Sequence, residues 1–246
     1  MIVLFTDFGY EGPYVGQVKA VLAANAPGVT VIDLMHDAPA YAVAPAAFLL
    51  PALAAEFPLR SVFLAVVDPG VGGTRKSLVV EAAGRWFVGP DNGLFEVLLR
   101  RGEWRCWEIV WRPARLSSTF HGRDLFAPVA AALACGGSPE AIGCVPVSPT
   151  RSQEWPDDLG EVIYVDRYGN LVTGLRAASV HRGARLGIAD RSVAFARTFS
   201  DMPAGHAFWH ENSNGLVEIA VNRGRADLIL GGIGTKVALI ASDHHA

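Results

Sequence analysis

Short apolar runs rich in Val, Ile, Leu and Phe recur through the first 145 residues, and few polar residues interrupt them. Such runs are typical of strands that are buried on both faces of a sheet. Segments with helical patterns lie between them. The strand-like runs are residues 2–5, 29–34, 61–67, 77–82 and 86–88, and the helical segments are 14–25, 43–56, 94–101 and 124–134. This alternation predicts a layered α/β domain with a mainly parallel sheet.

The pattern changes near residues 146–158, where Pro, Ser, Thr and charged residues gather without apolar periodicity. We interpret residues 149–158 as a linker between a domain at 1–148 and a domain at 159–246. Beyond the linker, short strand-like runs are separated by turns. These runs are residues 161–165, 171–175, 185–188, 192–196, 217–221, 226–230 and 236–240. They predict a small, mostly antiparallel C-terminal domain that forms a β-barrel.

Charge and hydropathy argue against two classes of partner. The chain has 21 basic and 24 acidic residues and a net charge of −3, so it lacks the basic character of a nucleic-acid binder. Residues 38–55 carry no charge, and the stretch approaches the length of a membrane span. Because Pro39, Pro45 and Pro51 obstruct a continuous helix, we expect a buried, interrupted helix and no membrane segment.

Three cysteines indicate a reducing compartment. Cys106, Cys135 and Cys144 have spacings that fit neither a disulfide framework nor a zinc site, so we expect free thiols. The N-terminal apolar run is short and lacks a basic flank, which predicts a first strand rather than a signal peptide. A cytoplasmic location follows from both observations. Residues 243–245 are expected to be a solvated tail, because two adjacent histidines without a third ligand rarely bind metal.

Several familiar catalytic signatures are absent. The sequence contains no G-x-S-x-G and no H-E-x-x-H, which argues against serine-triad hydrolases and the common zinc proteases. Residues 70–77 superficially resemble a phosphate-binding loop. However, Arg75 stands where the second glycine is required, and a strand-like run follows where a helix should begin. We therefore do not expect a nucleoside triphosphate site.

Polar residues follow several of the strand-like runs. Asp7 follows the first run, Asp68 follows the third, and Asp91 and Asn92 lie in a turn after residues 86–88. The carboxyl ends of parallel strands are where open α/β sheets bind ligands. Each residue alone could cap a helix or organise a turn. Four acidic or amide groups at one edge of a sheet favour a ligand site.

His121 precedes a glycine at a predicted junction between a loop and a helix. A lone histidine is more often a structural residue than a catalytic one. Together with Asp68 and Arg75, however, it would supply a titratable base beside a carboxylate and a fixed cation. Because no serine or cysteine nucleophile accompanies these groups, a reaction with water is the natural hypothesis. A metal-dependent phosphoesterase with Asp7, Asp68 and His121 as ligands stays open as an alternative.

Several motifs resemble those of the S-adenosylmethionine hydroxide adenosyltransferase family, which is related to the fluorinases and chlorinases. The N-terminal motifs are Thr6-Asp7-Phe8-Gly9 with Tyr14-Val-Gly-Gln-Val-Lys19, Asp68-Pro-Gly-Val-Gly72 with Arg75, Gly89-Pro-Asp-Asn-Gly-Leu94 and Phe120-His121-Gly-Arg-Asp124. The C-terminal motifs are Asp166-Arg-Tyr-Gly-Asn170 and Asn212-Ser-Asn-Gly215 with Glu218-Ile-Ala-Val-Asn222. The resemblance therefore spans nearly the whole chain. It implies hydrolysis of S-adenosylmethionine to adenosine and L-methionine by attack of water on the ribose 5′ carbon, with no cofactor and no metal.

The resemblance also implies the roles of individual residues. It makes Asp68, Arg75 and His121 the catalytic group that activates the water. The resemblance places Asp7 at the ribose hydroxyls, and it places Asp166, Asn170 and Ser213 at the methionine portion or ribose. It makes Tyr41 and Phe199 aromatic partners of the ligand, with Phe199 against adenine. It also implies Glu218 and Val221 as contacts of the adenine edge. It further implies a homotrimer, with each substrate between the N-terminal domain of one subunit and the C-terminal domain of its neighbour. A non-catalytic module that binds adenosine or S-adenosylmethionine is a further alternative.

The sequence departs from the halogenating relatives where their nucleophile binds. Those relatives carry a tyrosine where this chain has Asp68, and they carry hydroxyl side chains where it has Val71 and Gly122. A halide beside Asp68 would meet like charge instead of hydroxyl donors. These departures disfavour halogenation.

Overall fold

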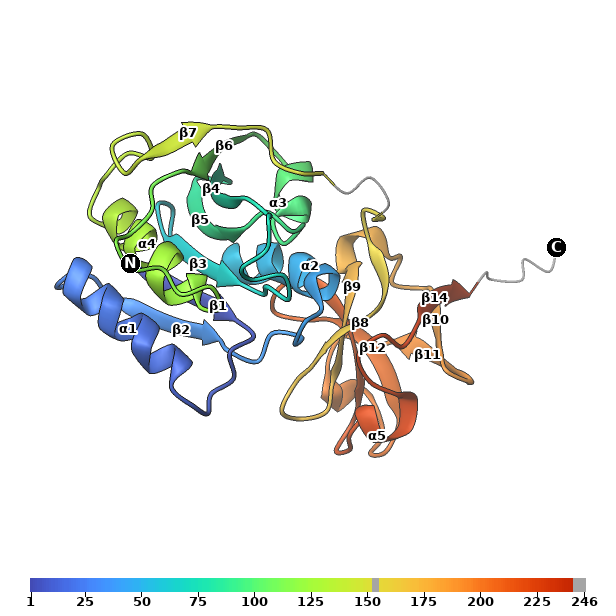
Figure 1. The fold of residues 1–246 in the computed structure, drawn as a ribbon. Helices are drawn as coiled ribbons and strands as arrows, with labels where there is room; N and C mark the ends of the chain where they lie inside the picture. The colour runs from blue at the N-terminus through green and yellow to red at the C-terminus, as the bar shows by residue number, and fades with distance from the viewer. Residues whose placement is uncertain (152–154, 241–246) are drawn as a thin grey trace. The chain divides into compact units, whose positions relative to one another are not determined.

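Figure 1 shows a computed structural model of the chain, in which every residue is described except 152–154 and 241–246. The chain divides into two compact units. One consists of Met1–Ala47 and Phe57–Gln153, and the other of Phe48–Glu56 and Glu154–Ala246. Each unit contains one seven-stranded sheet. The expected tail at 243–245 lies outside the described residues, as does part of the expected linker.

The sheet of the first unit is mixed, with the strand order β2-β1-β3-β5-β4-β6-β7. The strands that pair in parallel with one another are β1 (Ile2–Thr6), β2 (Val31–Met35), β3 (Val62–Val66) and β5 (Arg85–Pro90). The strands that pair antiparallel with their neighbours are β4 (Ser77–Ala82), β6 (Trp104–Ile109) and β7 (Cys144–Pro146). The expectation of a mainly parallel sheet is therefore not confirmed.

A tight turn accounts for the change of direction in this sheet. Ala83 and Gly84 have positive φ angles, 50° and 69°, and they join Ala82 directly to its cross-strand partner Arg85. Two central residues with φ > 0 form the hairpin turn that matches the twist of adjacent antiparallel strands. The run at 77–82 is thus a hairpin strand, and no crossover helix precedes β5.

Two helices cover the parallel part of the sheet. In α1 (Tyr14–Asn25), Val18 and Leu22 are buried in one core cluster with Ile2 and Leu4 of β1. In α4 (Ala127–Ala134), Val129 and Ala130 belong to the same cluster. A π-helical turn, η1 (Gly122–Phe126), directly precedes α4, so the expected helix at 124–134 exists with an altered first turn. The expected helix at 94–101 is shorter and forms α3 (Glu96–Arg100).

The uncharged stretch at 38–55 forms a helix shorter than a membrane span. The helix is α2 (Val43–Ala54), it contains Pro51, and it buries Phe48 and Leu50. The helix continues through Pro51 to Ala54, so the expected interruption is not observed within it, although proline removes one backbone donor there. Across the described residues, no helix combines the length and the apolar character needed to cross a membrane.

The sheet of the second unit is almost closed, with the strand order β14-β10-β11-β12-β13-β9-β8. Its strands are β8 (Leu159–Val165), β9 (Leu171–Arg176), β10 (Arg185–Ile188), β11 (Arg191–Phe195), β12 (Ala207–Glu211), β13 (Leu216–Val221) and β14 (Val237–Ile240). All neighbouring pairs are antiparallel except β11 with β12. An antiparallel bridge between Glu161 and Lys236 brings the two edge strands together. The unit is therefore nearly barrel-shaped.

Two segments of this unit differ from the sequence-based expectation. The run expected as a strand at 226–230 forms a short helix, α5 (Asp227–Leu230), which is followed by Gly231 with φ of 103°. A five-residue apolar run cannot by itself distinguish a short buried helix from a strand, so this prediction was wrong. β12 was not predicted. It carries Trp209, which is buried in the barrel core with Val162 and Ile219.

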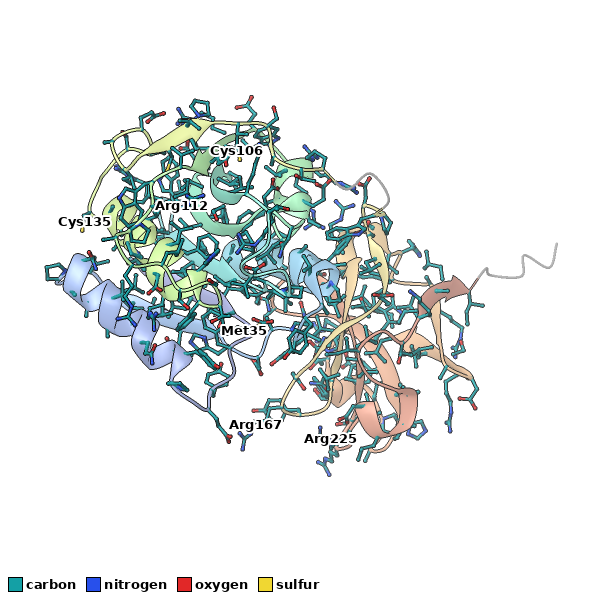
Figure 2. All side chains as sticks on the ribbon, in the orientation of Figure 1. Met35, Cys106, Arg112, Cys135, Arg167 and Arg225 are labelled. Atoms are coloured by element: carbon teal, nitrogen blue, oxygen red, sulfur yellow. The ribbon has the colours of Figure 1, made fainter. Side chains whose placement is uncertain are left out.

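The three cysteines are free thiols, as expected. Cys106 is buried on β6, and Cys144 is buried at the start of β7. Cys135 is exposed just after the end of α4, and Figure 2 labels Cys106 and Cys135 on these segments. Cys106 and Cys144 should be less reactive than the exposed Cys135, because burial in an apolar environment disfavours the thiolate.

Candidate functional site

The three residues predicted as a catalytic group come from separate segments of the first unit. Asp68 lies two residues after the end of β3, and Arg75 lies in the loop that leads into β4. His121 lies directly before the π-helical turn η1. The structure brings these three side chains into contact, although 46 positions separate Arg75 from His121.

Arg75 joins the other two members of the cluster. Its Nε donates to Asp68 Oδ1 at 2.7 Å, and its Nη2 contacts Asp68 Oδ2, which makes a two-point ion pair. Its Nη2 also lies 3.3 Å from Nδ1 of His121. Its Nη1 donates to the carbonyl of Lys76 and to Oγ of Ser77. A planar guanidinium held at all three nitrogens keeps one orientation, so Arg75 is a fixed cation at this site.

The contact with Arg75 assigns the protonation state of His121. A guanidinium has donors only, so Nδ1 of His121 accepts, and the proton of the neutral ring lies on Nε2. Burial lowers the pKa of His121, and the charge of Arg75 lowers it further, while Asp68 acts in the opposite direction. His121 is therefore neutral at pH 7, with its lone pair directed at Arg75.

A small cavity of about 60 Å³ lies beside this cluster. Its lining residues are Asp7, Phe8, Val66, Asp68, Val71, Thr119, Phe120, His121 and Gly122. A water molecule needs roughly 10–15 Å³ of such space, so the cavity can hold one or a few waters beside Asp68 and His121. Thr119 was missed by the sequence analysis, although it stands only two positions before His121 in the chain.

Gly122 gives this cavity its shape. A Cβ atom added at Gly122 would lie 2.9 Å from Cζ of Phe8, which is closer than such contacts allow. The Phe8 ring in turn makes an edge contact with Phe120, at 5.6 Å between centroids. A hydroxyl side chain at position 122 would therefore require the aromatic wall of the cavity to move.

Asp7 lines the same cavity from the carboxyl end of β1. Burial raises the pKa of Asp7, the charge of Asp68 adds to this effect, and a hydrogen bond from the backbone N–H of Tyr41 opposes it. That N–H lies 3.3 Å from Asp7 Oδ2. Tyr41 has a positive φ of 60°, and its side chain is exposed, so within this unit it meets Asp7 through its backbone rather than its ring.

Asp91 and Asn92 serve the local fold. Asp91 is buried and accepts hydrogen bonds from the N–H and the hydroxyl of Thr150. Asn92 donates to the carbonyl of Val67 at 2.9 Å. The side chains of these two residues therefore hold chain segments together. Within the described ranges 1–151 and 155–240, no group of three or more His, Cys, Asp or Glu residues is arranged to hold a metal ion.

A larger cavity of about 880 Å³ lies within the second unit. It falls in the range of small-molecule sites, roughly 300–1,000 Å³. The residues predicted for substrate binding that line it are Asp166, Asn170, Phe199, Ser213, Glu218 and Val221. Other lining residues, which the sequence analysis did not select, include Tyr168, Arg197, His210, Asn212, Arg223 and Arg225. The C-terminal candidates thus share one pocket, which is separate from the cavity beside Asp68.

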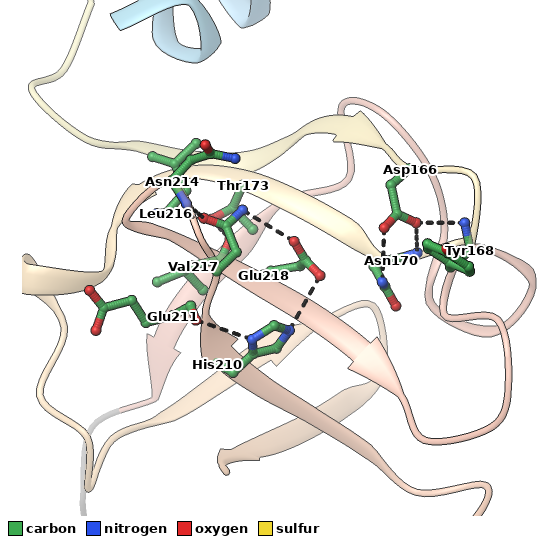
Figure 3. Close-up of polar contacts among 11 residues, drawn as sticks. Asp166, Tyr168, Asn170, Thr173, His210, Glu211, Asn214, Leu216, Val217 and Glu218 are labelled. Carbon is green, nitrogen blue, oxygen red and sulfur yellow. Dashed lines mark hydrogen bonds and ion pairs between the residues drawn. The ribbon is translucent and has the colours of Figure 1, made fainter. Parts of the chain in front are cut away.

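At one wall of this pocket, Asp166 organises a tight turn (Figure 3). Its Oδ1 accepts the N–H groups of Tyr168 and Asn170, both at 2.8 Å, and its Oδ2 accepts Nδ2 of Asn170 at 2.9 Å. Oδ1 is therefore saturated, whereas Oδ2 retains one acceptor site. The side-chain carbonyl of Asn170 makes no hydrogen bond within the described residues, which leaves it able to accept from a ligand.

At another wall, a carboxylate and an aromatic group lie side by side. The ring of Phe199 makes edge contacts with Phe208 and His210, at 5.1 and 5.4 Å between centroids. His210 is the cross-strand partner of Glu218, and its Nε2 lies 3.3 Å from Glu218 Oε1 (Figure 3). Asn212 donates to Glu218 Oε2 at 3.1 Å. These groups form an amphipathic wall that suits a flat heteroaromatic ligand with polar edges.

Two family models match the chain. The N-terminal domain of SAM hydroxide adenosyltransferase matches residues 2–143, and the C-terminal domain of SAM hydroxide adenosyltransferase matches residues 160–237. An (R)-S-adenosyl-L-methionine hydrolase of Thermus thermophilus is 43% identical, over 94% of this chain and 95% of that protein. A fluorinase of Actinopolyspora mzabensis is 27% identical, over 90% of each chain. The crystal structure of an uncharacterized conserved protein from Thermotoga maritima matches with a TM-score of 0.88 and 33% identity, over 98% of this chain and all of that one.

Proposed function

Because the chain belongs to the SAM hydroxide adenosyltransferase family, we propose that it hydrolyses S-adenosyl-L-methionine to adenosine and L-methionine. Water attacks the ribose 5′ carbon, and methionine leaves as a neutral thioether. The contact chain of Asp68, Arg75 and His121 beside a water-sized cavity carries this proposal. No cofactor enters the reaction.

The charges at the cavity suit this substrate. The sulfonium is a cation, and attack by an oxygen with hydroxide character removes charge in the transition state, so a nearly dry cavity favours the step. Asp68 places negative charge where the sulfonium arrives, and the positive charge of Arg75 stabilises the oxygen as it develops anionic character. Free water has a pKa of about 15.7, so the proton must leave as the C–O bond forms rather than before it.

Asp68 is the proton acceptor in this proposal. The lone pair of His121 at Nδ1 is directed at Arg75, and its Nε2 carries a proton, so His121 acts as a donor that orients the water. Each oxygen of Asp68 accepts one bond from Arg75 and keeps a second lone pair. The arrangement thus supports a division of roles in which Asp68 receives the proton, His121 holds the oxygen in place, and Arg75 fixes both side chains and supplies positive charge beside them.

The residues that bind the rest of the substrate belong to two groups. Asp7 binds the ribose hydroxyls from the first unit, and Tyr41 is an aromatic partner of the ligand. Phe199 contacts adenine, Glu218 and Val221 face its edge, and the methionine portion or ribose meets Asp166, Asn170 and Ser213. The common pocket of the last six residues supports this assignment.

We propose a cytoplasmic homotrimer, in which each substrate lies between the N-terminal domain of one subunit and the C-terminal domain of its neighbour. Light scattering coupled to size exclusion measures the subunit number. A mixing experiment tests the shared site, because Asp68→Asn removes the proton acceptor from one half of it and the double variant Asn170→Ala/Phe199→Ala removes two substrate contacts from the other. Trimers assembled from both variants should regain part of the wild-type turnover, and no recovery in verified mixed trimers contradicts a site between subunits.

Hydrolysis by water is preferred over halogenation. Asp68 is already paired with Arg75 at this cavity, and Val71 and Gly122 offer no hydroxyl donors to a halide. A hydroxyl side chain at position 122 would also require the Phe8 ring in the cavity wall to move. Chloride or fluoride in the assay should therefore leave adenosine as the nucleoside product.

The test is a single incubation of purified protein with S-adenosylmethionine in oxygen-18 water. Mass spectrometry should detect L-methionine together with adenosine labelled at its 5′ oxygen. The same yield should be obtained with a chelator, and Asp68→Asn should produce neither product. Unlabelled adenosine refutes attack by water at the 5′ carbon, loss of activity with chelator favours a metal-dependent phosphoesterase, and nucleoside binding without methionine release favours a binding module.

A further inference from the structure

A buried histidine that the proposed reaction does not use lies next to the loop that carries Asp7. His36 directly follows β2, and only 1% of its surface is exposed. Its Nδ1 lies 2.8 Å from Oγ1 of Thr6, the last residue of β1. Its Nε2 lies 3.2 Å from Oδ1 of Asp33, whose Oδ2 accepts Nζ of Lys19 at 2.9 Å. His36 thus joins two adjacent parallel strands at their carboxyl ends.

The backbone around this histidine connects the same two loops. The N–H of Gly9 donates to the carbonyl of His36 at 2.7 Å, and the N–H of Ala38 donates to the carbonyl of Thr6 at 3.1 Å. Asp7 lies between Thr6 and Gly9, and both of these residues are hydrogen-bonded to the loop after β2. Six residues beyond the end of β2, Tyr41 in the same loop supplies the N–H that Asp7 accepts. The direction of the Asp7 carboxylate therefore depends on how these loops are held together.

Asp33, His36 and Thr6 are connected in the same order, carboxylate to imidazole to hydroxyl, as the groups of a hydrolytic triad. Thr6 is nevertheless not a nucleophile. Its side chain is buried with 1% exposure, and it is not among the residues that line the cavity beside Asp68. Its Oγ1 also accepts the N–H of Phe8 at 3.3 Å. A hydroxyl that no substrate can reach serves structure rather than chemistry.

The surroundings of His36 show that its polar atoms have few other partners. The Tyr10 ring packs edge-on against the imidazole, at 5.4 Å between centroids. Burial alone would raise the pKa of Asp33, but hydrogen bonds from Lys19 and His36 outweigh it and lower that pKa. Asp33 thus stays ionised opposite Nε2. If the Thr6 hydroxyl were removed, Nδ1 of the imidazole would be buried with nothing to bond, which is unfavourable.

We propose that His36 is a positioning residue, which ties the Asp7 loop to the Tyr41 loop through its contact with Thr6 and so sets the direction of the Asp7 carboxylate. This inference rests on the proposed function, in which Asp7 binds the ribose. Because Asp7 binds substrate and transition state alike, loss of His36 should raise KM and leave kcat nearly unchanged. A purely structural role would lower the amount of folded protein without changing KM.

The variants separate the two contacts of the imidazole. His36→Phe keeps the ring and removes both polar contacts, and Thr6→Val removes the hydroxyl with little change in shape. His36→Asn places an amide near the position of Nδ1, so it should retain the contact with Thr6. The matched control is Ser61→Ala, which removes a buried hydroxyl that donates at 2.7 Å to the carbonyl of Pro58 at the opposite end of the sheet.

Two measurements on the full chain decide the inference. Steady-state assays should give a KM roughly 10-fold higher for His36→Phe and Thr6→Val, with little further increase in the double variant, because a misplaced binding group lowers effective affinity. His36→Asn should stay within about threefold of wild type, as should Ser61→Ala. Hydrogen exchange should become faster at the amides of Gly9 and Tyr41 in His36→Phe and remain unchanged in Ser61→Ala.

The outcomes distinguish this inference from the proposed function. An unchanged KM and unchanged exchange in folded His36→Phe overturn the positioning role, and so does an equal effect in Ser61→Ala. If His36→Phe does not fold, Thr6→Val and His36→Asn decide in the same way. If the wild-type protein does not hydrolyse S-adenosylmethionine, the proposed function fails, and the exchange measurement alone still decides whether His36 holds the two loops.

Discussion

Replacing Arg75 with methionine should separate catalysis from binding most clearly. The substitution keeps an apolar side chain of similar length and removes the cation that contacts Asp68 and His121. The side chain of Arg75 is 10% exposed, and that of Asp68 is 4% exposed. Arg75→Met therefore leaves a carboxylate nearly buried without its partner.

The size of each effect follows from this geometry. Removing one partner of a buried ion pair costs about 3–5 kcal/mol, and we expect the lower end because Asp68 opens onto a cavity. For a chain of this length, about 3 kcal/mol corresponds to a fall in Tm of roughly 6–12 °C. The loss of the preorganised positive charge that fixes Asp68 and His121 beside the reacting oxygen should reduce kcat by roughly 10²–10³-fold. The affinity for adenosine should change little, since Arg75 does not contact the nucleoside in the proposed complex.

The assay compares kcat from product chromatography, Kd for adenosine from calorimetry, and Tm from circular dichroism. The double variant Asp68→Asn/Arg75→Met buries no charge, so it should regain most of the lost Tm while kcat stays low. The control is Arg176→Met, which removes a two-point pair with Asp158 that is more exposed, at 40% and 21%, and should leave kcat unchanged. A folded Arg75→Met with kcat within threefold of wild type, or with Kd raised as much as kcat is lowered, refutes the reasoning.

Three further predictions follow from pKa directions and from packing. Because the pKa of His121 is lowered in the folded protein, the unfolded chain binds more protons than the folded chain below about pH 6.5. The free energy of unfolding therefore falls as the pH drops from there through the folded pKa. The Tm of His121→Gln should accordingly decline less than that of the wild type between about pH 7 and pH 5. Burial raises the pKa of Cys106 to about 12 and that of Cys144 to about 11. Iodoacetamide near neutral pH should therefore modify only Cys135, which peptide mass mapping can detect. Labelling of either buried thiol in folded protein would contradict this. Phe199→Ala should weaken adenosine binding by roughly 3–10-fold in calorimetry, as expected for one aromatic contact, and equal affinity would remove it from the adenine site.

Sequence patterns were most informative for strands buried on both faces. The runs at 2–5, 61–67 and 86–88 all form strands, because near-continuous apolar runs are typical of strands that are buried on both faces of a sheet. β6 (Trp104–Ile109) was missed because two charged residues, Arg105 and Glu108, interrupt its buried ones, and one half-polar strand carries a weak signal. The direction of β4 was also missed. It depends on two residues with positive φ, one of which, Ala83, is not a residue that usually marks such a turn.

The candidate site was predicted unevenly. Asp68, Arg75 and His121 were selected from local motifs, and the structure brings their side chains into contact. His210 was not selected, because its position opposite Glu218 arises from the register of β12 and β13, and β12 itself was not predicted. His36 was also not selected. Its significance comes from burial between two strands that pair in parallel, which no short sequence window records.

Local residue order determined which chemical groups this protein has: a carboxylate after each of two buried strands, an arginine before a hairpin, and an imidazole ahead of a helix. The positions of these groups can be predicted from the sequence, because the hydrophobic periodicity of strands and helices is set within a few residues. Which groups meet was decided by strand order and register, since contacts such as Arg75 with His121 and Thr6 with His36 join segments 46 and 30 residues apart. The protonated nitrogen of His121 and the buried state of His36 were likewise decided there, because both depend on the partners that surround a side chain in space.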